Sequence, residues 1–63
     1  MLTTNTTNGV TNIEHSELGV VAKVWRQGNY QVKLAIGPDE WVRSEWATRE
    51  AAESVAIRHT ESL

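Results

Sequence analysis

The chain has 63 residues, of which 40% are hydrophobic, and it carries a formal net charge of −2 and no cysteine. Length and composition predict one globular domain, close to the smallest size that a hydrophobic core can sustain. The missing cysteines exclude a disulfide framework, a thiolate nucleophile and a zinc ribbon, and they favour a reducing, cytoplasmic location in a bacterium or a phage.

The N-terminal segment is polar, with five Thr and three Asn in the first twelve positions and no hydrophobic periodicity. Such a segment cannot bury enough apolar surface to offset the conformational entropy that it would lose on ordering. We therefore expect a disordered tail over residues 1–13 and a single folded domain over residues 14–63.

Three strands are predicted within this domain. Residues 20–25 (VVAKVW) are β-branched and aromatic, and residues 30–36 (YQVKLAI) alternate between apolar and polar side chains. Residues 41–46 (WVRSEW) form the third strand. The connections at residues 27–29 and 37–40 contain Gly, Asn and Pro, which favour tight turns, so the strands are expected to form antiparallel hairpins.

A C-terminal helix is expected over residues 49–60. Thr48 is a favourable N-cap, and an acidic residue in the first turn supports a helix start. The inner stripe of this helix consists of small and apolar side chains with one His: Ala51, Ala52, Val55, Ala56 and His59. Its alanines would let the helix axis lie close to a sheet. Ile57 falls outside the stripe and is expected to be exposed.

Together these elements predict an α+β fold, a three-stranded antiparallel sheet (β-β-β-α) with one C-terminal helix packed on one face. The expected core residues are Val20, Ala22, Val24, Val32, Leu34, Ile36, Val42, Trp46, Ala52, Val55 and Ala56. The register of the first strand is the weak point, because a shift by one residue would bury Val21 and Trp25 instead. We favour the register that keeps Lys23 outside, beside Lys33.

Residues suited to chemistry are few. The segment Glu14-His15-Ser16-Glu17 offers a base and metal ligands, but it lies at the edge of the predicted domain, where no rigid element would hold it. His59 near the helix C-terminus more often interacts with the helix dipole or borders the core. Phosphate loops and membrane spans are also missing from the sequence. We therefore expect a non-catalytic binding protein with no cofactor, metal, membrane or small-molecule substrate.

The open face of the sheet is the most informative feature. Although the net charge is negative, residues 20–36 contain three cations and no acid. The face is expected to display Lys23, Trp25, Gln31, Lys33, Trp41 and Arg43, with Glu45 at the edge. Lys and Arg neutralise phosphates, and Trp is enriched at recognition surfaces, so this pattern favours nucleic-acid binding, with double-stranded DNA first. The alternative is that Trp25 and Trp41 pack on each other, or on Ile13, as a small second core.

Several segments between residues 19 and 60 support this interpretation: Gly19-Val20, Lys23, Gly28-Asn29-Tyr30 and Trp46-Ala47-Thr48-Arg49-Glu50-Ala51-Ala52. In these segments the chain resembles the three-strand-plus-helix DNA-binding domains of tyrosine-integrase arm regions and of the plant ethylene-response-factor class. The resemblance implies that the sheet is the DNA-reading surface and that Lys23, Trp25, Lys33, Trp41 and Arg43 contact DNA.

A second hypothesis comes from another class of protein. The layout is also similar to small phage-encoded or mobile-element proteins that bind a host protein, such as RNA polymerase, and inhibit or adapt it. A short acidic chain fits that class. Its contacts would come from a sheet edge, the tryptophans or Ile57.

Overall fold

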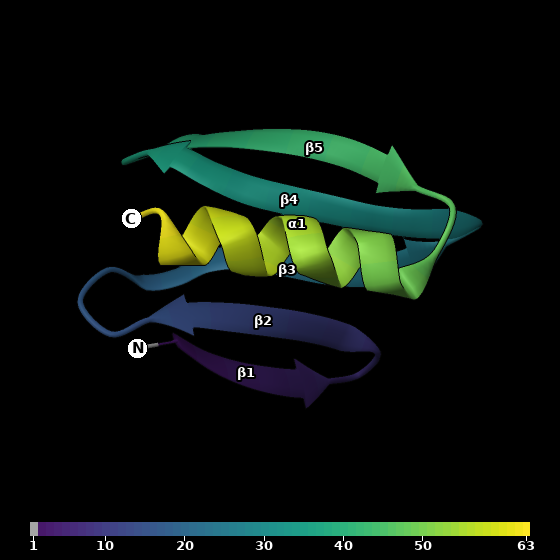
Figure 1. Ribbon diagram of the computed structural model, residues 1–63, viewed down its shortest axis with the longest axis horizontal. Coiled ribbons are helices and arrows are strands. Elements are labelled where there is room, and N and C mark those ends of the chain that lie inside the picture. The colour runs from purple at the N-terminus through teal and green to yellow at the C-terminus, as the bar shows by residue number, and fades with distance from the viewer. Residues whose placement is uncertain (1) are drawn as a thin grey trace.

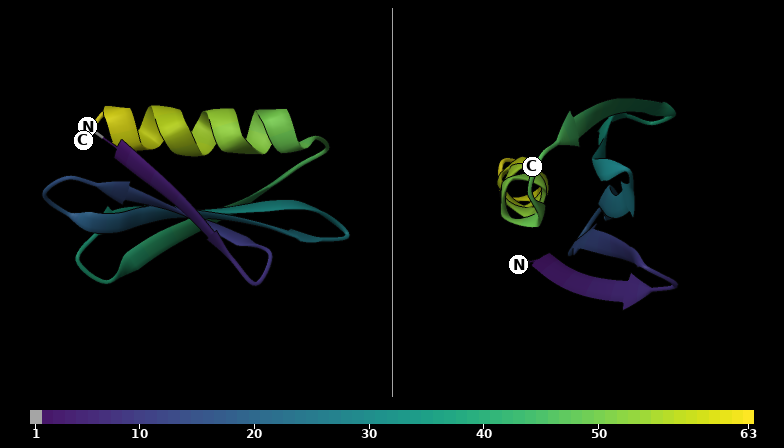
Figure 2. Two further views of the ribbon diagram at one scale, coloured as in Figure 1. Left: turned by 90° about the horizontal axis from the view of Figure 1, so that it is seen from below. Right: turned by 90° about the vertical axis from the view of Figure 1, so that its right-hand side faces the viewer.

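The computed structural model describes residues 2–63. Five antiparallel strands pair in chain order, and one helix follows them (Figure 1). The elements are β1 (Leu2–Thr7), β2 (Val10–His15), β3 (Gly19–Gln27), β4 (Asn29–Gly37), β5 (Glu40–Trp46) and α1 (Arg49–Glu61). The sheet curves around α1, so that the helix lies along the concave face and the opposite face is convex (Figure 2).

The helix begins where the sequence predicts. Thr48 has an extended backbone, and its hydroxyl oxygen accepts a hydrogen bond from the Ala51 N–H at 3.2 Å. Glu50 in the first turn and Arg58 and His59 in the last turn complement the helix dipole. The N-cap and the first-turn acid are therefore sufficient to locate this helix in the sequence.

The core lies between the concave face and α1. It contains the buried residues Ile13, Ala22, Val24, Val32, Ala52 and Ala56, and the half-buried Leu34, Trp46 and Val55 pack against it. Ala52 and Ala56 are completely buried, as expected for a helix whose small side chains bring its axis close to a sheet. Ile57 also packs against this core, so the expectation that it is exposed is wrong.

The N-terminal segment is ordered, which corrects the predicted tail over residues 1–13 and raises the strand count from three to five. Asn8 and Gly9 both have positive φ, 52° and 80°, as the tight turn between two hairpin strands requires. The β-branched threonines around this turn suit extended backbone. Ile13, only 1% exposed, anchors the hairpin in the core. Residue 1 lies outside the described residues.

Two β-bulges at one end of the sheet change which side chains are buried. The β4–β5 register shifts between Ala35 and Gly37, so Ile36 is an extra residue and is 57% exposed. The β2–β3 register shifts so that Val21 has no partner on β2; Val21 is 4% exposed, while Val20 is only half-buried. Strict alternation fails at a bulge, and for this reason Val20 and Ile36 are not the core residues that alternation predicts.

The register of β3 and β4 is otherwise the favoured one. Lys23 pairs with Lys33, and Ala22 and Val24 are buried under the helix. Val42 was expected in the core, but it is exposed, because it lies on the edge strand β5, away from the helix (Figure 1).

Candidate functional site

The convex face carries a row of three cations on neighbouring strands. Lys23 on β3 pairs with Lys33 on β4, and Lys33 pairs with Arg43 on β5. Because their neighbours Ala22 and Val24 face the helix, the period of two places the cations on the opposite side. Like charges directly opposite each other destabilise a sheet, so the row has an electrostatic cost that an anionic ligand would relieve.

No acidic side chain neutralises this row. Within residues 2–63 the one ion pair joins Arg49 to Glu53 on the helix, at 3.4 Å. Glu45 shares the convex face, but it lies opposite Gln31, and its carboxylate accepts a hydrogen bond from the Asn29 side-chain amide at 3.4 Å. The positive charge of the row is therefore available to a partner.

Two tryptophans flank the row, one on each side. The Arg43 guanidinium carbon lies 5.3 Å from the centre of the Trp25 ring, and the Lys33 ammonium nitrogen lies 5.9 Å from that of Trp41. Trp25 pairs with Gln31 and Trp41 with Ala35, four residues apart on β4, which is about 13 Å along a strand.

This separation, together with the position of Ile13 on the concave side, does not fit the alternative of a second core built from the two tryptophans. Each tryptophan instead stacks with a cation, an arrangement that contributes about 0.5–1 kcal/mol at exposed sites.

Gln31 lies beneath the Arg43 side chain on the convex face and fixes its position through a hydrogen bond. It is only 2% exposed, so the expectation that its side chain is displayed on the open face is wrong. Its side-chain oxygen accepts a hydrogen bond from Arg43 Nε–H at 3.2 Å, and its amide nitrogen donates to the carbonyls of Gln27 and Asn29. The guanidinium is thus fixed by one hydrogen bond and one aromatic ring, while its terminal N–H groups make no hydrogen bond within residues 2–63.

The structure therefore brings all six predicted site residues to one face. Lys33, Trp41 and Arg43 are exposed, Lys23 and Trp25 are half-buried, and Gln31 is buried. Asn12 on β2 pairs with Lys23 and extends the row by one position. Sequence reasoning missed it because it lies in the predicted tail, although the Asn8-Gly9 pair is a hairpin signal that could have found it.

The acidic segment before β3 has a structural role in this fold. His15 Nδ1 accepts hydrogen bonds from the backbone N–H groups of Glu17 and Leu18, at 3.0 and 3.3 Å, which closes the β2–β3 turn. Among residues 2–63, no group of three or more His, Cys, Asp and Glu side chains is arranged to hold a metal ion. The helix α1, within residues 2–63, is too short and too polar to cross a membrane.

Comparisons with known protein families, with curated proteins and with solved structures find no match to this chain. A functional proposal for this chain therefore rests on the geometry of the convex face.

Proposed function

We propose that this chain is a non-catalytic nucleic-acid-binding protein that contacts double-stranded DNA through its convex sheet face. The observation that carries the proposal is the unneutralised row of Lys23, Lys33 and Arg43, with one tryptophan on each side. Phosphate groups would relieve the repulsion within the row, because Lys and Arg neutralise phosphates in protein–DNA interfaces.

The shape of the face supports a duplex groove as the target. The three strands β3, β4 and β5 span about 10 Å at about 4.8 Å per strand, and the major groove of B-DNA is about 12 Å wide. A convex sheet can enter such a groove, with the fixed Arg43 guanidinium offering a fork of donors to a phosphate or to the edge of a guanine.

The salt dependence of binding tests the proposal. If Lys23, Lys33 and Arg43 each neutralise one phosphate, the slope of log K against log salt should be about −3, at about −0.9 for each phosphate. Replacing any of the three with Ala should flatten the slope by about 1. The control is Arg58→Ala, which removes the same charge from the helix and should leave the slope unchanged.

A second outcome would favour the alternative function, in which the chain binds and inhibits or adapts a host protein. If no duplex binds at about 50 mM salt, and if Trp25→Ala or Trp41→Ala abolishes capture of a host protein, the tryptophans serve a protein partner. The DNA proposal would then be wrong, and the chain would be an inhibitor or adaptor. Affinity for random DNA should be weak in either case, because the net charge of −2 opposes long-range attraction.

A further inference from the structure

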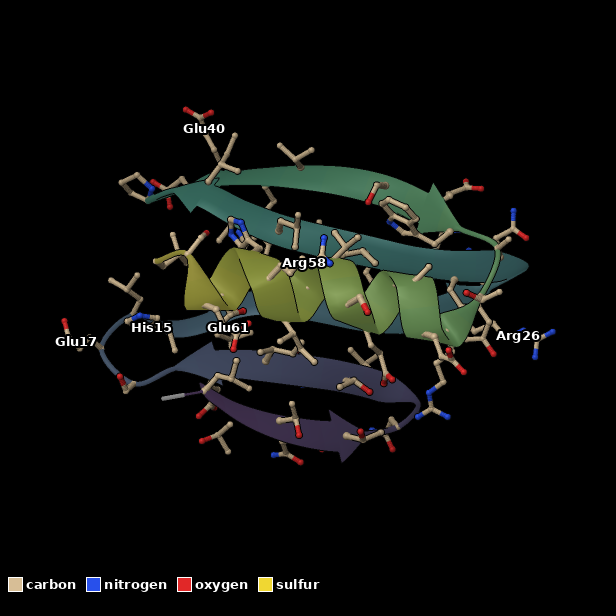
Figure 3. The ribbon with its side chains drawn as sticks, in the orientation of Figure 1. His15, Glu17, Arg26, Glu40, Arg58 and Glu61 are labelled. Carbon is tan, nitrogen blue, oxygen red and sulfur yellow. The ribbon has the colours of Figure 1, made fainter. Side chains whose placement is uncertain are left out.

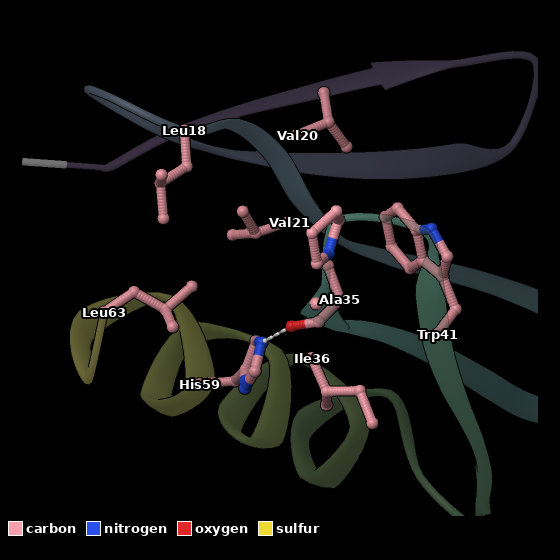
Figure 4. Close-up of a pocket in the computed structure, with 10 residues that line it drawn as sticks. Leu18, Val20, Val21, Ala35, Ile36, Trp41, His59 and Leu63 are labelled. Carbon is pink, nitrogen blue, oxygen red and sulfur yellow. Dashed lines mark hydrogen bonds between the residues drawn. The ribbon is translucent and has the colours of Figure 1, made fainter.

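An apolar hollow lies at the end of the molecule where the β2–β3 turn, the β4–β5 hairpin and the last turn of α1 meet. It has a volume of about 670 Å³, and the residues that line it include Leu18, Val21, Ile36, Trp41, His59 and Leu63 (Figure 4). Of these residues, only Trp41 contacts the cation row, through Lys33.

The large hydrophobic side chains that stay exposed gather at this hollow. Leu18, Ile36, Trp41 and Leu63 are between 38% and 61% exposed, and each of them lines it. Val42, the remaining exposed residue of this kind within residues 2–63, directly follows Trp41. Scattered apolar side chains are ordinary on a protein surface, but a group of them around one concavity is typical of an interaction site.

The two β-bulges build the hollow. They place Val21 and Ile36 out of the regular alternation at the same end of the sheet. Between them, the His59 side chain donates a hydrogen bond from Nε2 to the Ala35 carbonyl at 2.6 Å, which ties the helix to β4 (Figure 4). The floor is thus a fixed surface, and bulges are over-represented next to functional sites.

Four acidic side chains belong to the elements that form the rim. Glu17 precedes Leu18, Asp39 lies in the β4–β5 turn, Glu40 is the first residue of β5, and Glu61 is in the last turn of the helix. All four are exposed, and none forms an ion pair within the described part of the chain. Figure 3 shows Glu17, Glu40 and Glu61 at this end of the molecule and Arg26 at the opposite end.

We propose that this hollow is a docking site for a basic peptide segment of a partner protein. An apolar floor accepts apolar side chains such as Leu, and the carboxylates at this end of the molecule attract Lys or Arg residues that flank them. The proposal goes beyond DNA binding and does not depend on it, because the apolar hollow and the cation row have only Trp41 in common.

The probe is a synthetic, end-capped peptide of alternating Leu and Lys, titrated into the isotope-labelled protein and followed by amide chemical shifts. We expect shifts at Leu18, Ile36 and His59, and none at Lys23 or Arg43. The same peptide with Glu in place of Lys should cause no shifts. If both peptides bind equally, or if the shifts fall on Lys23, Lys33 and Arg43 instead of on the hollow, the proposal is wrong.

Matched variants separate docking from general attraction between opposite charges. Glu40→Gln should lower the affinity for the Leu-Lys peptide by about threefold, which is the size expected for one surface ion pair. Glu50→Gln removes the same charge at the other end of the helix and should have no effect. Ile36→Ser should weaken binding by about tenfold, through lost apolar contact, whereas Val10→Ser, at the far end of β2, should not.

Two results would overturn the proposal. If Glu50→Gln weakens binding as much as Glu40→Gln, the peptide is held by net charge alone. If the protein dimerises with increasing concentration in analytical ultracentrifugation and Ile36→Ser abolishes the dimer, the occupant is a second copy of this chain. Ile36 is exposed, so its replacement should preserve the fold, and a thermal melt of each variant checks this.

Discussion

Trp41 and Trp46 lie at the two ends of the same strand, but their surroundings differ. Trp46 packs against the core on the concave face, and its Nε1–H donates to the Ser44 hydroxyl at 2.8 Å. Trp41 lies on the convex face and is exposed. Of the two tryptophans of this strand, Trp46 therefore belongs to the core and Trp41 to the surface, according to the face on which each one lies.

We predict that Trp46→Ala lowers the free energy of unfolding by about 3 kcal/mol, the low end of the range for core aromatics, because the side chain is half-buried. Trp41→Ala should cost less than about 1 kcal/mol, since it lies at the surface. Urea unfolding followed by circular dichroism measures both. Equal losses for the two variants would contradict this division of roles.

Gln31 shows how a buried amide can serve an exposed cation. Gln31→Leu removes the acceptor for Arg43 Nε–H and the donor for the carbonyls of two exposed residues, Gln27 and Asn29. We predict a loss of stability of about 1 kcal/mol. We also expect the Arg43 Nε–H to exchange faster with solvent, measured by NMR, while that of Arg26 stays unchanged. Unaltered Arg43 exchange would show that Gln31 does not position the guanidinium.

At the scale of elements, the sequence predicts the parts that have strong local signals. The Thr48 cap, the Gly-containing turns and the alternation in β4 are sufficient for the helix and for the β3–β4–β5 meander. Residues 2–15 lack alternation, so their strands can be found only from the Asn8-Gly9 turn and from the β propensity of threonine. The bulges at Val21 and Ile36 leave no mark in the sequence, because an extra residue looks like any other strand residue.

The same limits apply to the candidate sites. Strand register places the cation row on one face, and this could be predicted. The burial of Gln31 could not be predicted from the sequence, because it depends on Arg43 and Trp25 lying across its side chain. The apolar hollow also could not be predicted, because two turns and the C-terminal end of the helix, distant in sequence, meet there only after folding.

The ordered N-terminal hairpin leads to a direct prediction about stability. Ile13→Ala should lower the free energy of unfolding by about 2–4 kcal/mol, because Ile13 is completely buried under the helix. Thr3→Ala on the exposed part of β1 should change it by less than about 0.5 kcal/mol. Chemical denaturation of both variants measures the difference. A negligible effect of Ile13→Ala would mean that the hairpin is not part of the cooperative fold.

For the whole molecule, the placement of charge matters more than its sum. The molecule is 31 Å long in its largest dimension, whereas the screening length at physiological salt is about 8 Å. Acidic side chains more than about 8 Å from the cation row therefore act weakly on a ligand bound there. A chain of net charge −2 can then present a face that is locally positive, as the proposed binding of phosphates requires.

Glu45→Gln and Glu61→Gln test this distribution, because each raises the net charge by the same amount. Glu45 shares the convex face with the cation row, so its neutralisation should strengthen duplex binding by about threefold near 150 mM salt, in line with one surface charge contact. Glu61, in the last turn of α1, should have a much smaller effect, because α1 lies on the concave face and the cation row on the opposite face of the sheet. Fluorescence anisotropy with a labelled duplex measures both variants side by side. Equal strengthening by the two variants would show that net charge governs binding, and the convex face would then lose its role as the specific contact surface.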